Sequence, residues 1–315
     1  MTAWVLGGLG VLVFSLSLPA NKIAVVGVDP VGITVWRAAI AGVLAGAYLL
    51  AVRAPVPRGA AAARLAVSGL GVVVGFPLLS SLALQSIDSG RAAVILGLLP
   101  AVTAMSAQLI GGERLPAGFW AASLAGIAVL TTYLLASRPG AAATGFGWGD
   151  LAMLGATVCS GFGYAVGARE AKNIGGARSI SWTLVLLLPL SLPATSVASL
   201  TGTYDLKPPV IAAMGYIAVV SQLLGFFAWY GGLARGGIAR VGQIQQLQPI
   251  LTLIASAALL GEPLAAGTYL VGAAIAALVW LAQRARATAT SAATRPRPAP
   301  GSVVSDELAH ESNRS

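Results

Sequence analysis

Residues 91–118 read RAAVILGLLPAVTAMSAQLIGGERLPAG, and residues 240–267 read RVGQIQQLQPILTLIASAALLGEPLAAG. The two stretches align without a gap at a constant offset of 149 residues. Identical residues recur in the same order: Arg91 and Arg240, Pro100 and Pro249, Thr103 and Thr252, Glu113 and Glu262, Leu115 and Leu264, and Gly118 and Gly267. One shared proline would carry little weight, but an ordered set at one offset indicates an internal repeat.

The composition places most of the chain in lipid. Its 315 residues are 57% hydrophobic and only 9% charged, with a mean hydropathy of +0.84, whereas soluble domains carry about 25% charged residues. The net charge is +9, but the basic residues lie between apolar segments and form no stripe with aromatics, so we expect no nucleic-acid partner. The single cysteine, Cys159, excludes an intramolecular disulfide.

Ten apolar stretches recur along the chain, each close to the ~20 residues that cross a bilayer as a helix. They are Ala3–Ala20, Val31–Val52, Leu65–Ser86, Ala92–Ile110, Gly118–Ala136, Gly149–Gly167, Ile180–Leu200, Val210–Leu233, Val241–Leu260 and Gly267–Leu281. The first lacks the basic start and cleavage motif of a signal peptide, so we expect a retained helix. The pattern predicts an all-α membrane protein of about ten transmembrane helices.

The basic residues predict the orientation. With both termini in the cytoplasm, 14 of the 19 Lys and Arg fall in cytoplasmic segments, as the positive-inside rule requires. Five helices per half is an odd number, so the second half must enter the membrane the other way up. We therefore predict a multi-pass plasma-membrane protein with a first repeat over 1–137, a second, inverted repeat over 138–283, and a disordered cytoplasmic tail over 284–315.

Both copies contain a proline, twelve further residues and a glutamate that follows a glycine, at Pro100–Glu113 and Pro249–Glu262. With Trp36 and Arg37 in the second span, these residues resemble the EamA-type families of the drug/metabolite transporter superfamily. The resemblance covers roughly residues 3–283. It implies a ten-helix bundle that exports or exchanges metabolites, with a cavity lined mainly by spans one, three, four, six, eight and nine.

Pro100 and Pro249 lie near the middle of spans four and nine. A proline has no N–H to donate a hydrogen bond to the carbonyl four residues earlier, which is that of Leu96 for Pro100 and that of Gln245 for Pro249. Paired interruptions in the two halves of a transporter indicate a binding site at the membrane midplane. The alternative is that each proline only bends its helix to suit packing.

Span nine carries four amides within six residues: Gln243, Gln245, Gln246 and Gln248. Each must hydrogen-bond another helix, water or substrate, because lipid offers no partner. Residues one position apart differ by 100° around a helix, so the four cannot share one face. We predict that Gln245 and Gln246, about one turn before Pro249, contact the substrate; the alternative for each is a hydrogen bond between helices.

Arg37 lies within the second span, where a charge is costly. Its guanidinium is suited to bind a substrate carboxylate or phosphate with two hydrogen bonds, or else it reaches outward to the interface. Aromatic and polar residues of spans three, six and eight complete the predicted lining: Ser81, Gln85, Tyr164, Gln222, Trp229 and Tyr230. The rings near the end of span eight have a second interpretation, as anchors at the membrane interface.

The acidic residues limit the mechanism. All ten lie in loops, at predicted helix ends or in the tail, and the duplicated Glu113 and Glu262 are expected to pair with nearby backbone or arginine. Without a carboxylate or histidine at mid-membrane, proton-driven drug efflux is disfavoured.

We therefore predict a secondary transporter that moves an amino-acid-like or other neutral, zwitterionic or anionic solute by alternating access, as an exporter or exchanger. The expected partners are a small-molecule substrate and the bilayer, with no catalytic residue, metal or cofactor, because no acidic or histidine cluster and no phosphate-binding motif occurs. The alternatives are a proton-coupled drug efflux carrier and a structural or channel-like membrane protein.

Overall fold

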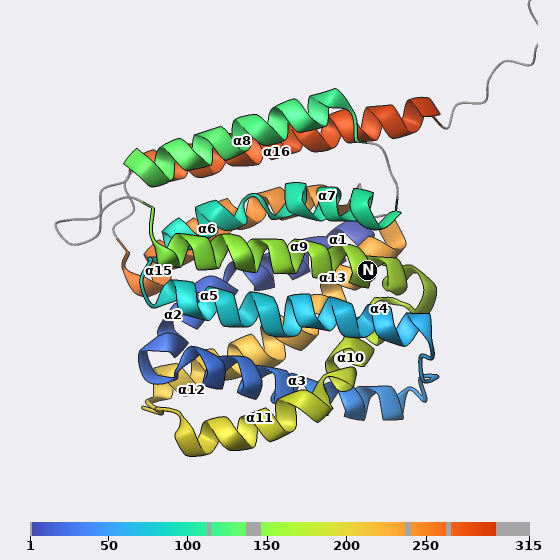
Figure 1. The fold of residues 1–315 in the computed structure, drawn as a ribbon, viewed down its shortest axis with the longest axis vertical. Coiled ribbons are helices and arrows are strands. Elements are labelled where there is room, and N and C mark those ends of the chain that lie inside the picture. The colour runs from blue at the N-terminus through green and yellow to red at the C-terminus, as the bar shows by residue number, and fades with distance from the viewer. Residues whose placement is uncertain (1, 112–114, 137–145, 237–240, 263–265, 294–315) are drawn as a thin grey trace, which may run out of the picture.

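The structure is a computed structural model that describes residues 2–111, 115–136, 146–236, 241–262 and 266–293. Within these ranges the regular structure is helical, apart from a single antiparallel bridge between Val28 and Tyr204. The helices run side by side across the view in Figure 1. The prediction of an all-α membrane protein is confirmed.

Several expected spans are divided into shorter helical pieces. In the first half these are α1 (Ala3–Ser15), α2 (Ser17–Gly27), α3 (Pro30–Ala51), α4 (Ala60–Gly69), the π-helix η1 (Leu70–Gly75), α5 (Phe76–Leu84), α6 (Ser89–Leu96), α7 (Leu99–Gly111) and α8 (Ala117–Ala136). In the second half they are α9 (Trp148–Ile174), α10 (Gly176–Leu186), α11 (Leu188–Thr201), α12 (Pro208–Gly215), the π-helix η2 (Tyr216–Gly225), α13 (Phe226–Gly236), the 3₁₀-helix η3 (Gly242–Leu247), α15 (Gln248–Leu260) and α16 (Ala266–Ala293).

Six helical stretches of the described residues are long and apolar enough to cross a membrane: Ala3–Gly27, Pro30–Ala51, Ala60–Leu84, Ser89–Ile110, Trp148–Ile174 and Pro208–Gly236. The pair α10 and α11, bent by 54°, makes a seventh candidate. Shorter apolar helices lie where the other three spans are expected, over Ala117–Tyr133, Ile244–Leu260 and Ala266–Ala282. The count of ten spans stays a prediction.

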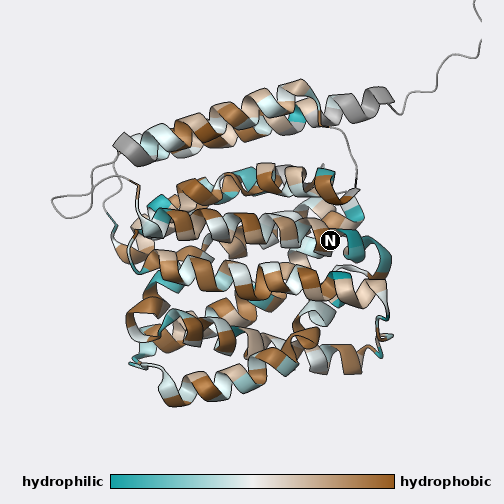
Figure 2. Ribbon diagram, in the orientation of Figure 1, coloured by the Kyte–Doolittle hydropathy of each residue, from teal (hydrophilic) through white to brown (hydrophobic). Residues whose placement is uncertain are grey.

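The outer surface of the bundle suits lipid. Large apolar side chains point outward along it, with Leu50 81%, Leu109 84% and Leu200 88% exposed. Hydrophilic residues gather mainly near the helix ends, as Figure 2 shows. Such a surface would be unfavourable in water and is stable in a bilayer, where every helix satisfies its own backbone.

The two halves interleave rather than fold as separate units. Helix α1 packs on α13 and α15, α3 packs on α10 and α11, and α5 packs on α9. Small residues permit this closeness: a Cβ atom on Gly71 of η1 would lie 3.0 Å from the Cα of Gly163 on α9. The buried core therefore belongs to both halves at once.

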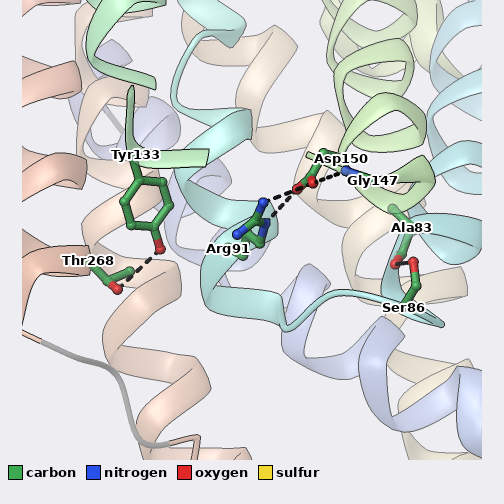
Figure 3. Close-up of polar contacts among 7 residues, drawn as sticks. All are labelled: Ala83, Ser86, Arg91, Tyr133, Gly147, Asp150 and Thr268. Atoms are coloured by element: carbon green, nitrogen blue, oxygen red, sulfur yellow. Dashed lines mark hydrogen bonds and ion pairs between the residues drawn. The ribbon is translucent and has the colours of Figure 1, made fainter. Parts of the chain in front are cut away.

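Helices α8 and α16 pack against each other along one edge of the bundle (Figure 1). A Cβ atom on Gly118, near the start of α8, would lie 3.2 Å from the Cβ of Ala285, late in α16. Tyr133, late in α8, has its hydroxyl 3.2 Å from that of Thr268, early in α16 (Figure 3). The two helices therefore run antiparallel.

The end of the second repeat differs from the sequence prediction. Helix α16 continues to Ala293, although a disordered tail was expected from residue 284. Alanine and arginine favour helix, and the Arg284 guanidinium lies 4.0 Å from the centre of the Trp280 ring four residues earlier. Residues 294–315, the rest of the predicted tail, lie outside the described ranges, as does the predicted repeat boundary at 137/138.

The two ends of the bundle differ in charge. The end where α3, α9 and α13 finish, on the right in Figure 1, carries Arg53, Arg58, Arg64, Arg169, Lys172, Arg178 and Arg235. We call it the basic end; the sequence predicts that it faces the cytoplasm. The opposite end, where α2, α5 and α11 finish, carries Lys22, Asp88, Asp150 and Glu262.

Candidate substrate cavity

A small cavity lies inside the bundle, where helices of both halves meet. Its volume is about 20 Å³, enough for one water molecule. The lining residues are Phe14, Ser17, Leu18, Arg37, Val72, Phe76, Leu96, Leu99, Ser160, Tyr164, Ser221, Phe226 and Gln248. Spans one, three, four, six, eight and nine all contribute, as the resemblance implied, and span two adds Arg37.

Arg37 is the cation of this lining. Helix α3 starts at Pro30 and is capped by Asp29, whose carboxylate accepts from the Gly32 amide at 2.9 Å, and this fixes Arg37 about two turns into the span. Its side chain is only 3% exposed, so it does not reach outward to the interface. Within the described ranges, the Arg37 Nε has no hydrogen-bond partner and no carboxylate lines the cavity.

Hydroxyl groups surround the cavity on two sides. The hydroxyl oxygens of Ser17 and Ser221 lie 2.7 Å apart and join the first half to the second. Ser17 is the first residue of α2, directly after the break at Leu16. Ser160 and Tyr164 lie one turn apart on α9, so both present to the same side. These groups hydrogen-bond readily to a polar solute.

Two π-helices position the phenylalanines of the lining. The π-helix η1 in span three ends at Gly75 and is followed by Phe76, and η2 in span eight ends at Gly225 and is followed by Phe226. Both rings line the cavity, together with Phe14. A π-helix holds an extra residue per turn and is frequent at functional sites. The same irregularity thus occurs at corresponding places in the two halves.

Trp229 and Tyr230 lie one turn further along α13, toward the basic end. They are 1% and 0% exposed, so they are not anchors at the membrane interface. The Tyr230 ring centre lies 5.3 Å from that of Phe226 and 6.4 Å from that of Tyr164. We call Trp229 and Tyr230 the aromatic layer; they pack behind the cavity and do not line it.

A larger open cavity, which we call the vestibule, lies beyond the aromatic layer at the basic end. Its volume is about 650 Å³. It is lined by Leu6, Tyr48, Ala171, Lys172, Ile174, Gly175, Gly176, Ala177, Arg178, Phe227, Gly231, Ala234 and Arg235. Helix α13 therefore passes from the small cavity at Phe226, through the aromatic layer, to the vestibule at Gly231.

Polar contacts close the opposite end of the bundle. Lys22 donates to the carbonyls of Leu84 at 2.7 Å and Ile87 at 2.8 Å, which ties span one to the end of span three. Arg91 and Asp150 form a two-pronged ion pair between α6 and α9, with Nε–Oδ1 at 2.6 Å and Nη2–Oδ2 at 2.9 Å (Figure 3). Span one is thereby joined to span three, and span four to span six.

Glu262 adds a further contact at this end, across the two halves. Its carboxylate accepts hydrogen bonds from the amides of Ser89 and Gly90, both at 3.1 Å, and from the Ser89 hydroxyl at 2.9 Å. It thus caps the positive N-terminus of α6. The expected backbone pairing of Glu262 is confirmed; its counterpart Glu113 lies outside the described residues, and so does Arg240, the counterpart of Arg91.

The glutamine of span nine that lines the cavity is not one of the two that were predicted to do so. Gln248 lines the cavity, and its Oε1 has no hydrogen-bond partner. Gln245 and Gln246 are buried, and their Nε2 atoms have no partner, but neither residue lines the cavity. The side chain of Gln243 lies outside the described part of the chain.

The polar residues predicted on span three lie outside the cavity. Gln85 is exposed, directly after the end of α5. The Ser81 hydroxyl instead donates to the Asn21 side chain at 3.1 Å, which links spans three and one. On span eight, the Gln222 side chain is buried and donates to the Val72 carbonyl at 3.4 Å.

The two prolines each stand just after an interruption. Pro100 is the second residue of α7, after the break at Gly97 and Leu98, and Pro249 is the second residue of α15, after the 3₁₀-helix η3. Proline is well accommodated in the first turn of a helix. Leu96 and Leu99 flank the first break, and both line the cavity. The paired interruptions therefore lie beside the cavity.

The sequence reasoning missed Phe14, Phe76, Phe226, Ser17, Ser160 and Ser221. Phe76 and Phe226 each follow a glycine, but Gly-Phe also occurs at 118–119, 145–146 and 161–162, so the pair alone would not have identified them. The serines gave no signal, because single serines are common in membrane helices. Among the described residues, no group of three or more His, Cys, Asp or Glu side chains is arranged to hold a metal ion.

Comparisons with known proteins agree with this architecture. The model of the EamA-like transporter family matches residues 1–136 and again 147–283. "Uncharacterized transporter YdeK" of Bacillus subtilis (strain 168) is 43% identical over 283 residues, which cover 90% of this chain and 96% of the relative. "Uncharacterized transporter YyaM" of the same organism is 25% identical over 206 residues, covering 63% and 65%.

A solved structure described as "Crystal structure of protein" has a similar fold. Its TM-score is 0.62, and the match covers 91% of this chain and 98% of that one. The sequence identity is only 20%, so the likeness bears on the fold alone.

Proposed function

The chain belongs to the EamA-like transporter family, and on that premise we propose that it is a secondary transporter that exports or exchanges a small organic solute. The observation that carries the proposal is a cavity of mixed apolar and polar lining, built from both halves of the chain, that lies between an aromatic layer at one end and a set of polar contacts at the other. A site enclosed on both sides is what alternating access requires.

The proposed mechanism opens one end at a time. At the basic end, Trp229 and Tyr230 would have to move aside to join the cavity to the vestibule. At the opposite end, the Arg91–Asp150 pair and the contacts of Lys22 and Glu262 would have to separate. A volume of about 20 Å³ admits no organic solute, so binding must accompany the widening of one end.

The duplicated architecture supports this mechanism. Both halves place a π-helix before a cavity phenylalanine and an interruption before a proline. Helices α8 and α16 begin at corresponding positions of the two copies yet run antiparallel. Two inverted copies support two conformations of similar energy, one open to each side. We propose the repeat boundary near residues 137/138, and a plasma-membrane orientation with both termini in the cytoplasm.

The cavity favours a solute other than a cationic drug. In the part of the chain that the structure describes, its lining includes Arg37, hydroxyl groups and the Gln248 amide, but no carboxylate or imidazole that would exchange a proton for a cation. The proposed cargo is therefore neutral, zwitterionic or anionic, and its binding needs no cofactor. The predicted contacts of Arg37 and Tyr164 with the cargo are retained in this proposal, and Gln248 replaces Gln245 and Gln246 as the amide that touches it.

Counterflow in proteoliposomes tests the proposal. Solutes chosen by thermal stabilisation of the purified full-length protein, from amino acids, organic acids, nucleosides and sugar phosphates, would be loaded inside the vesicles, and labelled solute supplied outside. A carrier should accumulate labelled solute transiently, because its binding site reorients across the membrane faster when solute from inside the vesicle occupies it. Equilibration with no stimulation from the inner solute would contradict a carrier and indicate a channel.

A further inference from the structure

We propose that the transported solute is an organic acid whose carboxylate pairs with the guanidinium of Arg37. This inference rests on the proposed function, because it assigns the class of cargo to the cavity of that transporter.

Arg37 carries a buried charge that no neighbouring described residue balances. A guanidinium in the interior of a membrane protein normally pairs with a carboxylate or with backbone carbonyls. Among the described residues the ion pairs are Arg64–Glu170, Arg91–Asp150 and Lys207–Asp205, and none involves Arg37. Its Nε is buried without a hydrogen-bond partner, and its side chain is 3% exposed. A buried charge without a partner lowers stability, and an oxyanion bound beside it would remove that cost.

The chemistry of the lining suits an oxyanion. Guanidinium and hydroxyl groups donate hydrogen bonds, and Ser160 and Tyr164 place two hydroxyls in the same small cavity as Arg37. Ser17 and Ser221 also line it, but the Ser17 hydroxyl already donates to the Val13 carbonyl at 3.2 Å and lies 2.7 Å from the Ser221 hydroxyl. A carboxylate accepts several such bonds at once. The rings of Phe14, Phe76 and Phe226 supply the apolar surface that the organic part of an acid requires.

The charge count distinguishes among oxyanions. Arg37 is the single charged residue among the described residues that line the cavity, so it neutralises one negative charge. A carboxylate carries one charge at neutral pH, whereas a phosphate monoester carries about −1.5 to −2. A phosphate ester would therefore enter with surplus charge, and the cavity favours a monocarboxylate.

The route from the basic end agrees with this assignment. The described residues that line the vestibule include Lys172, Arg178 and Arg235 and no acidic residue. Positive potential in a concave site raises the local concentration of anions. The positive-inside rule alone would also place basic residues at this end, so the vestibule supports the proposal without carrying it.

Paired ligands test the proposal on the purified full-length protein. The panel is lactate, benzoate, N-acetylalanine and alanine, each beside its primary amide, with glycerol phosphate as the phosphate arm. We expect at least one acid, at millimolar concentration, to raise the melting temperature when its amide does not. Equal shifts from an acid and its amide, a shift only from the phosphate ester, or no shift from any acid would overturn the proposal.

Variants of Arg37 test the assigned partner. Arg37→Gln should abolish the shift given by the acid, Arg37→Lys should retain part of it, and Arg58→Gln, which removes an exposed arginine in the loop before α4, should leave it unchanged. An acid-specific shift that persists in Arg37→Gln would overturn the proposal.

The ligand-free protein gives a second readout that does not depend on finding a substrate. If Arg37 is unpaired until cargo binds, Arg37→Met should leave the melting temperature of the ligand-free protein unchanged or raise it, because a buried charge is replaced by an apolar chain of similar length. A lowered melting temperature would show that Arg37 is a structural residue. Counterflow separates the two proposals. If a neutral solute showed counterflow that Arg37→Gln did not change, the proposed transport function would stand, and the proposal of a carboxylate cargo would be refuted.

Discussion

Arg37 and Arg91 are arginines of the same half with opposite surroundings. The Arg91 guanidinium is held by both oxygens of Asp150 near a helix end (Figure 3), whereas Arg37 lies deeper, beside hydroxyl groups, with a free Nε. Paired charges fix a structure, since each satisfies the other. A charge left without a partner has no structural benefit to offset its burial, and this difference is why we assign Arg37 to binding and Arg91 to closure of the opposite end.

The Arg91–Asp150 pair makes a prediction at the scale of single residues. Asp150→Asn keeps the size of the side chain but removes its charge, and with it the ion pair to Arg91, whose side chain is only 12% exposed. We expect the free energy of unfolding to fall by about 3 kcal/mol, which is typical when one partner of a buried pair is lost. Titration of the purified protein with a denaturing detergent measures the change.

The exposed pair Lys207–Asp205 provides the control. Its side chains are 71% and 56% exposed, and ion pairs in water contribute little, so Asp205→Asn should unfold like the unmodified chain. If Asp150→Asn behaved like Asp205→Asn, the buried pair would not stabilise the opposite end.

At the scale of elements, the contact between α1 and α13 decides how the basic end can move. A Cβ atom on Gly10 would lie 2.9 to 3.0 Å from the backbone and Cβ of Trp229 in the aromatic layer. The backbone and Cβ of Trp229 cannot move away from an added methyl group by a rotamer change, as the end of a flexible side chain can. The closeness of the two helices therefore depends on the absence of a side chain at Gly10.

Gly10→Ala should push α1 away from α13 and disturb the aromatic layer. We expect the substitution to lower the free energy of unfolding by about 1 to 3 kcal/mol, as overpacking does, and to reduce the rate of counterflow. Gly8→Ala is the matched control on the same helix, because nothing lies within 4 Å of the added Cβ. Equal stability and counterflow for the two variants would refute the close-contact interpretation.

At the scale of the whole molecule, the sequence predicted the features that follow from composition and periodicity. The expected spans fall on the helices of the structure, and Arg37 and Tyr164 were both predicted on the cavity. The prediction of which side chains face the cavity failed where the helix is irregular. The 3₁₀-helix η3 covers Gln245 and Gln246, and its turn of 3.0 residues rotates side chains away from the positions that a regular α-helix would give them.

The same limit applies to span three. The π-helix η1 adds a residue to its turn, so the side chains that follow it are rotated relative to a regular helix counted from the start of the span. Gln85, at the far end, was predicted on the lining and is exposed instead. Such irregularities depend on contacts with other helices, for example that of Gly71 with α9. The local periodicity of a sequence carries no information about those contacts.

The inverted arrangement makes a prediction about the whole chain. Ala117 and Ala266 are the first residues of α8 and α16, occupy corresponding positions at the offset of 149, and are both exposed. If the halves are inverted, these alanines face opposite sides of the membrane. Each would be replaced by cysteine in a Cys159→Ala background, which removes the single native thiol, and labelled with an impermeant maleimide in vesicles of known orientation.

Two reference positions define the sides in the same background. Arg58→Cys marks the basic end and Asp205→Cys marks the opposite end. We expect Ala117→Cys to be labelled from the same side as Arg58→Cys, and Ala266→Cys from the same side as Asp205→Cys, because α8 and α16 run antiparallel from opposite ends of the bundle. Labelling of both alanine positions from one side would mean that the copies are parallel. Alternating access would then lose the symmetry from which we derive it.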